Sequence, residues 1–149
     1  MIQPHDSVIV LTLGRVVIPL VQLFGLYVVF FGQHGPGGGF VGGVILATSM
    51  ILSILIFGPT ASNSSLARKV LHGDGLGLLI FAGVGGLCLI GGGEFMNYAE
   101  LEIPGLDAAS RRYLGIAMAQ IGVAADVAVT GISIALSLSS ENNDEVSHG

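Results

Sequence analysis

Between Val16 and Ala67 the chain contains no aspartate, glutamate, lysine or arginine. A water-facing surface interrupts an apolar stretch of this length repeatedly with charged side chains. Over the whole chain, charged residues make up 10% of the 149 residues, whereas a soluble domain carries about 25%. The sequence therefore predicts a protein whose natural solvent is lipid.

Four apolar segments are long enough to cross a membrane. A helix rises about 1.5 Å per residue, so about twenty apolar residues are needed to cross roughly 30 Å of hydrocarbon. An open β-sheet is excluded because its edges would leave backbone groups unpaired in lipid. We therefore predict an all-α integral membrane protein, a bundle of four transmembrane helices within one domain of residues 1–139. The predicted spans are Val8 to Phe31, Phe40 to Gly58, Leu76 to Gly93, and Leu114 to Leu138.

The connections between these segments predict the topology. Residues 32–39 are mainly glycine and proline, so the first two helices should form a tight antiparallel hairpin. With four spans, both termini lie on the same side of the membrane as Arg68 and Lys69. Arg15 adds to the positive charge of that side, which predicts a cytoplasmic N-terminus. The first 14 residues contain no lysine or arginine, so we expect the first span to be retained and not cleaved as a signal peptide. Residues 140–149 are polar, and we expect a mobile tail.

Several classes of function are excluded by what the sequence lacks. The single cysteine, Cys88, permits neither an intrachain disulfide nor a metal site built from paired cysteines. The net charge of −5 argues against a nucleic-acid partner. No nucleophile stands beside an orienting base, and no two histidines have the helical spacing of metal ligands. We expect no catalytic centre, no metal and no cofactor, so the chain is not predicted to be an enzyme.

The glycine-rich stretch of residues 37–43 has two readings. It matches the spacing G-x-G-x-x-G, but a nucleotide site needs a preceding strand and an acidic residue about twenty positions later. Both flanks are predicted membrane spans, and the next acidic residue is Asp74. Glycines four positions apart, such as Gly39 and Gly43, instead let another helix approach closely in a membrane. We therefore interpret the stretch as a helix-packing motif.

Asp126 lies at the centre of the fourth predicted span. An ionised carboxylate at that depth costs roughly 2.5 to 3.5 kcal/mol on insertion scales. One interpretation is an ion-translocation site that faces a polar path. The other is a structural ion pair, for which Arg15 is the candidate partner, about 10 Å deep against about 18 Å for Asp126. The sequence leaves the two interpretations open.

Three further residues are weaker candidates for ion translocation. Gln120 belongs to the same span as Asp126 but not to the same face, and packing between helices explains it equally well. His34 lies in the Gly-Pro turn, where a histidine could shuttle protons, although an ordinary interfacial turn residue is the simpler reading. Glu94 follows three glycines at a membrane boundary, where it would either guide cations or belong to a solvated loop.

The stretch GQHGPGGGFVGGVI, from Gly32 to Ile45, resembles the MnhB-type subunit of the Mrp multisubunit cation/proton antiporters. The resemblance continues more weakly through GGGEFMNYAELEIPG and AQIGVAADVAVTGISIAL, so it covers nearly the whole chain. Related subunits occur in membrane-bound hydrogenases. The residues that match the family motif are Gly32, Pro36, Gly37, Gly38, Gly39, Phe40, Gly42 and Gly43.

Two positions depart from the family pattern. The family often has histidine directly after the first glycine of the turn, where this chain has Gln33 followed by His34. The family often has an acidic residue before the IG of the last span, where this chain has Gln120 and places its carboxylate further on, at Asp126. These departures put any proton role of His34 in doubt and leave open whether Asp126 replaces the missing acid.

The resemblance implies a small accessory subunit of a Na+/proton antiporter in the cell membrane, acting in sodium and pH homeostasis. Its expected partners are other integral membrane subunits and the lipid bilayer, and Na+ and H+ are the expected transported ions. Two alternatives stay open. The chain would be a membrane subunit of a hydrogenase-like, redox-driven ion pump, or it would be a structural spacer between larger subunits.

Overall fold

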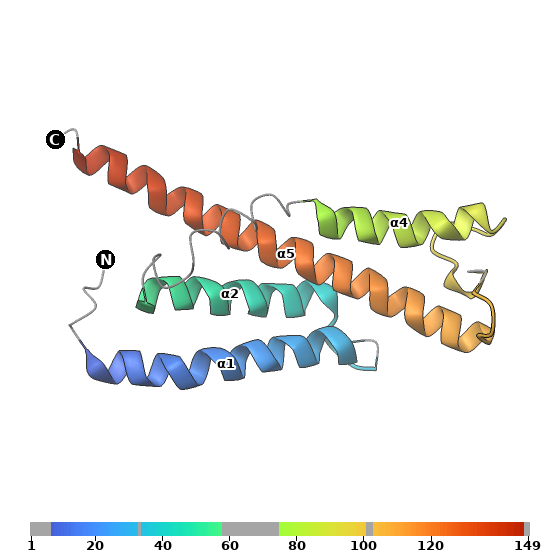
Figure 1. Ribbon diagram of the computed structural model, residues 1–149, viewed down its shortest axis with the longest axis horizontal. Coiled ribbons are helices and arrows are strands. Elements are labelled where there is room, and N and C mark those ends of the chain that lie inside the picture. Colours follow the sequence, from blue (N-terminus) through green and yellow to red (C-terminus); the bar gives the residue numbers. More distant parts are fainter. Residues whose placement is uncertain (1–6, 33, 58–74, 101–102, 148–149) are drawn as a thin grey trace.

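The computed structural model describes residues 7–32, 34–57, 75–100 and 103–147, and from residue 138 onwards only the backbone. Within these residues every regular element is a helix, which confirms the all-α prediction. The sequence-based expectations that involve Gln33, Gly58, Arg68 and Lys69 concern residues outside the described part of the chain. Figure 1 shows the elements in their order along the chain.

The first two helices have nearly the predicted bounds. Helix α1 spans Val8–Phe31, and the side chain of Ser7 caps its start by accepting a hydrogen bond from the Val10 amide at 3.4 Å. Helix α2 spans Gly39–Phe57. A serine in extended conformation before an apolar run is a common start of a helix, because its hydroxyl satisfies an amide that the helix leaves unpaired.

The glycine-proline turn folds α1 and α2 into an antiparallel hairpin. Gly38 has φ of 112°, a conformation that side-chain-bearing residues rarely adopt, and its amide donates to the Val28 carbonyl at 3.3 Å. At the far end of the pair, Gly14 packs against Ile56. The two helices are therefore in contact along their whole length, as the short connection predicts.

Helix α4 spans Leu76–Ile90 and ends before the predicted third span does. Gly91 caps the helix, and Gly92 has φ of 83°, so the glycine run that we assigned to the span reverses the chain instead. With 15 residues, α4 is about 22 Å long and falls short of the length that crossing a bilayer requires. Three helices in the described part of the chain are long and apolar enough to cross: α1, α2 and α5.

Helix α5 is longer than predicted at both ends and spans Ala108–Ser147. It starts early because the Asp107 carboxylate accepts hydrogen bonds from the Ser110 hydroxyl and from the backbone amides of Ala109 and Ser110. At the other end the backbone stays helical through the polar residues predicted as a tail. A short 3-10 helix, η1 (Tyr98–Glu100), lies between α4 and α5.

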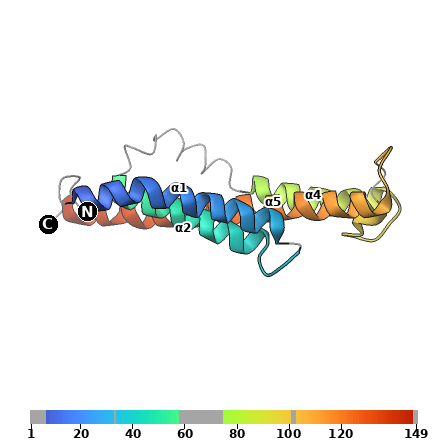
Figure 2. The same ribbon diagram turned by 90° about the horizontal axis from the view of Figure 1, so that it is seen from below.

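We predicted a bundle of four transmembrane helices, and the four helices of the described part of the chain are arranged in a layer (Figure 2). In the described part of the chain, α5 packs between α2 and α4, α1 packs mainly on α2, and α4 contacts neither α1 nor α2. Figure 2 shows the thin profile of the layer, and Figure 1 shows α2 and α4 beside different halves of α5. A closed bundle would need α4 beside α2, and this offset along α5 prevents it.

Candidate functional site

Asp126 lies in the contact between α5 and the start of α4. A Cβ atom placed on Gly77, in the first turn of α4, would come within 2.8 Å of the Asp126 Cβ. The Asp126 side chain is half-buried, and its Oδ1 atom is buried without a hydrogen-bond partner among the described residues. No residue of α4 is charged. The carboxylate therefore meets a neighbouring helix that offers no side-chain cation.

The structure does not bring Arg15 and Asp126 together. Arg15 is exposed on α1 next to Gly14, which packs on Ile56 near the end of α2. Asp126 lies at the level of Gly43, which packs on the turn of α5 around Ala124. The two levels are 13 residues apart along α2, or about 20 Å, which is beyond the reach of an arginine side chain. The structural ion pair is thus not formed in this chain alone.

The start of α4 offsets only part of the cost of the Asp126 carboxylate. A helix N-terminus carries about half a positive charge, which stabilises a nearby carboxylate by about 0.3–1 kcal/mol, and by about 2 kcal/mol when it is partly buried. The insertion cost of a charged residue at mid-span is roughly 2.5 to 3.5 kcal/mol. A proton, a cation or a group from outside the described residues must supply the difference.

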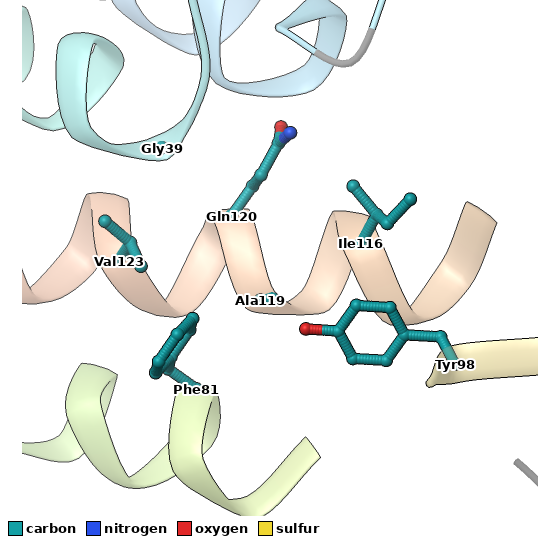
Figure 3. A pocket seen from close by; sticks show the side chains of 7 residues that line it. All are labelled: Gly39, Phe81, Tyr98, Ile116, Ala119, Gln120 and Val123. Carbon is teal, nitrogen blue, oxygen red and sulfur yellow. The ribbon is translucent and has the colours of Figure 1, made fainter. Parts of the chain in front are cut away.

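Gln120 lines a small cavity on α5, whose other walls come from α2, α4 and η1. The cavity has a volume of about 160 Å³, and its walls are mostly apolar, with the Gln120 amide and the Tyr98 hydroxyl as its polar side-chain groups. Figure 3 shows Gln120 pointing from α5 towards α2, on the side away from Phe81 of α4. The lining residues are Gly39, Phe81, Tyr98, Ile116, Ala119, Gln120 and Val123.

The glycines of the motif lie where α2 approaches its two neighbours. Gly39 and Gly43 are buried against α5, where added Cβ atoms would collide with the carbonyls of Gln120 and Ala124. Gly42 is buried on the other side of α2, against Val29 of α1. Pro36 and Gly37 belong to the turn, and the Phe40 side chain is 64% exposed. Gly38 provides the positive φ of the turn.

His34 and Glu94 lie apart from Asp126. His34 is exposed in the turn between α1 and α2, where its ring lies 6.4 Å from that of Phe31, which stacks on Tyr27 at 4.7 Å. Glu94 is exposed in the connection after α4. Of the four residues predicted for ion translocation, Gln120 and Asp126 therefore share α5, and the other two lie in separate loops.

The structure adds residues that the sequence analysis missed. Tyr98 packs against Gly115 of α5, and burial raises the pKa of its hydroxyl. Nothing in the sequence around Tyr98 marks it as a residue that packs on a membrane helix, because it lies in the connection between two predicted spans. Thr130, Ser133 and Ser137 follow Asp126 on the same face of α5. Their spacing from Asp126, at four, seven and eleven residues, is a signal that the sequence did contain.

Comparison with known proteins identifies the family of the chain. The family model described as "Domain related to MnhB subunit of Na+/H+ antiporter" matches residues 9–133. The chain is 33% identical to the Na+/H+ antiporter B subunit of Alkalihalophilus pseudofirmus over 133 residues, which cover 84% of this chain and 92% of that protein.

Two further relatives agree with the first. The Na+/H+ antiporter B subunit of Bacillus subtilis is 30% identical over 81% of this chain and 90% of its own length. The "Putative antiporter subunit mnhB2" of Staphylococcus haemolyticus is 40% identical over 53 residues, which cover 36% of this chain and 38% of that protein. The region matched by the family model contains α1 from its second residue, all of α2 and α4, and the part of α5 that carries Gln120 and Asp126. The chain therefore belongs to the MnhB-related family of Na+/H+ antiporter subunits.

Proposed function

We propose that this chain is a subunit of a multisubunit Na+/H+ antiporter and that Asp126 takes part in moving the ion. The chain is a multi-pass protein of the plasma membrane. Its relatives are named as antiporter subunits, which favours the antiporter over the redox-driven pump. The proposal assigns no catalytic reaction to the chain. Its expected partners are other integral membrane subunits and the lipid around them.

One observation supports the role of Asp126 most strongly. Its Oδ1 atom is buried, and the described residues give it neither a hydrogen-bond partner nor a neighbouring cation. The start of α4 compensates for less than the full cost of the charge. A sodium ion bound at this position would remove the uncompensated charge.

The position of α4 bears on a site at Asp126. Helix α4 begins beside Asp126 and runs towards the start of α5. We propose that α4 is part of a fourth membrane helix, because all of its residues are apolar or glycine and none is charged. A complete fourth crossing requires about twenty residues, and the segment that precedes α4 lies outside the described residues.

Replacing the carboxylate by an amide tests the proposal. Asp126→Asn keeps the shape of the side chain and removes its titration, so cation-dependent proton flux should fall by about tenfold or more in vesicles that contain the complete antiporter. The amount of assembled complex should stay the same. Asp107→Asn is the matched control, since Asp107 is an exposed carboxylate at the start of α5 and its replacement should leave flux unchanged.

Two results would contradict the role of Asp126. Unchanged flux in Asp126→Asn would exclude the residue from the ion path. Normal flux per complex together with a reduced yield of complex would assign Asp126 to assembly, which is the spacer reading of the sequence. The set of subunits that copurify in mild detergent separates the antiporter from a redox-driven complex.

A further inference from the structure

The small cavity on α5 lies along the same helix contact as Asp126, about one turn nearer the start of α5. In α4, Phe81 of the cavity wall lies one turn beyond Gly77, which packs against Asp126. In α5, Val123 lines the cavity three residues before Asp126. The cavity and the carboxylate are therefore neighbouring sections of one contact, with Phe81 and Val123 at the inner end of the cavity.

Tyr98 brings a hydroxyl into the cavity from the connection between α4 and α5. Gly115 has no side chain, so the Tyr98 ring packs directly on α5, and Figure 3 shows it extending towards Ala119. Burial raises the pKa of this hydroxyl, so it keeps its proton and can donate. Gln120 adds an amide from the side of α5 that faces α2, as Figure 3 also shows. The cavity thus has two polar groups on otherwise apolar walls.

The described part of the chain satisfies neither polar group. An amide and a phenol each offer a donor and an acceptor, and no described residue forms a hydrogen bond with the side chain of Gln120 or Tyr98. A lipid chain in the cavity would leave both groups unpaired, which is costly in hydrocarbon. Water supplies partners to both. The cavity volume of about 160 Å³ has room for about five water molecules.

We propose that this cavity is a water-filled entrance through which a sodium ion reaches Asp126 from the membrane surface at the α4–α5 connection. The inference rests on the proposed function, because it takes Asp126 as the destination. The oxygen atoms of Gln120 and Tyr98 replace part of the water shell of the ion, since hard cations take oxygen ligands. Between residues 91 and 110 the sequence contains four acidic residues and no lysine or arginine, which favours cations at the entrance.

Thiol labelling from the water phase tests whether the cavity is an aqueous entrance. In a Cys88→Ala background, Val123→Cys is treated with a cationic, membrane-impermeant methanethiosulfonate reagent in vesicles that contain the whole antiporter, and the labelled subunit is identified by its mass. Ala125→Cys is the matched control, since Ala125 is exposed at nearly the same depth of α5 and does not line the cavity. Ala109→Cys, exposed in the first turn of α5, reports which side of the vesicle carries the connection.

The proposal expects Val123→Cys to react about tenfold faster than Ala125→Cys or more, because the reactive thiolate forms in water and not in an apolar environment. The reaction should occur only from the side on which Ala109→Cys reacts. Equal rates at the two membrane positions, or labelling of Val123→Cys only from the opposite side, would overturn the proposal.

Removing one polar group tests whether the ion uses this entrance. Gln120→Leu keeps a side chain of similar size and removes the amide, so cation-dependent proton flux should fall about fivefold or more, because the groups that line an ion path replace water around the ion. Tyr98→Phe keeps the ring on Gly115 and is the second variant in case Gln120→Leu lowers the yield of complex. Ala125→Leu is the control and should leave flux unchanged.

The entrance and the role of Asp126 fail in different ways. Unchanged flux in both Gln120→Leu and Tyr98→Phe overturns the entrance, and the proposed function stands if Asp126→Asn still lowers flux. Unchanged flux in Asp126→Asn overturns the proposed function, and with it the destination of the entrance.

Discussion

The α1–α2 pair and the α4–α5 pair are both antiparallel hairpins, but only the first is paired along its whole length. Contacts in the α1–α2 pair run from Gly14 and Ile56 at one end to the turn at the other. In the α4–α5 pair, the first turn of α4 lies beside Gly122, which is partway along α5. A short turn fixes which residues of two helices lie side by side, and a long connection does not.

The two pairs also differ in how their buried polar atoms are satisfied. In the α1–α2 hairpin, the Gln22 amide donates to Met50 Sδ at 3.4 Å, and the buried Ser49 hydroxyl donates to the Leu46 carbonyl at 2.8 Å. On α5, the Asp126 Oδ1 and Ser133 Oγ atoms are buried without a hydrogen-bond partner among the described residues. The second pair therefore contains buried polar atoms that the described residues leave unsatisfied.

The largest effect on stability is expected at the contact between α2 and α5, which joins the two pairs. Gly43→Val places a branched side chain where even a Cβ atom would lie 2.8 Å from the Ala124 carbonyl oxygen. Overpacking of this kind costs about 1–3 kcal/mol or more, because backbone atoms have no alternative position. The thermal unfolding midpoint in detergent should fall and less complex should be recovered. Val41→Leu, at an exposed position of the same helix, is the control and should change neither quantity.

A smaller effect is expected within the α4–α5 pair. In Gly77→Ala the new methyl group would meet the Gly122 carbonyl and the Asp126 backbone, so the start of α4 should separate from α5. Gly83 belongs to the same helix and faces open space. Gly83→Ala should therefore be neutral, or stabilise α4 by up to about 1 kcal/mol through helix propensity. Hydrogen exchange of the α4 amides measures both variants, and equal exchange in the two would contradict the packing described for Gly77.

The smallest effect is expected at the start of α5, where the stability of the first helical turn should depend on pH. The Ser110 hydroxyl, with backbone amides, lowers the pKa of the Asp107 carboxyl below its ordinary value of 3.8. A depressed folded-state pKa stabilises the helix start above the ordinary pKa, and this contribution is lost as the pH falls through the lower, folded-state value. In hydrogen exchange, protection of the first turn of α5 should therefore decline below about pH 4 in the parent protein. Asp107→Asn keeps a capping side chain and should lack this decline, and a similar decline in both proteins would exclude Asp107 as its source.

The sequence predicted the parts of the fold that depend on local chemistry. The bounds of α1 and the hairpin with α2 follow from Ser7, an unbroken apolar run and a glycine turn. The end of α4 depends on whether Gly91–Gly93 continue the helix or reverse the chain, and the start of α5 depends on the cap at Asp107. Composition decides neither of these. The offset of α4 depends on contacts between distant segments and has no local signal.

In the candidate site too, the sequence predicted what local chemistry marks and did not predict contacts between distant segments. Asp126 is conspicuous in any sequence because it is charged within an apolar span. Arg15 was the candidate ion-pair partner of Asp126, but the depth of two residues along their helices gives no information on whether the helices are neighbours, and α1 packs mainly on α2. Ser133 was overlooked because a serine in a membrane helix is ordinary. It is notable in the structure because its buried hydroxyl has no hydrogen-bond partner among the described residues.

The central claim is that α4 lies beside the first part of α5 and that α2 starts at the same level and lies beside the later part. A distance measurement between spin labels at Phe40→Cys and Leu78→Cys, in the Cys88→Ala background, tests it most directly, since both side chains are exposed near the starts of α2 and α4. In this arrangement the two starts lie at the same level on either side of α5, so the distance should be about 20 Å, two helix spacings. In a closed bundle of full crossings the starts would lie at opposite membrane surfaces, and a distance above about 30 Å would contradict the account.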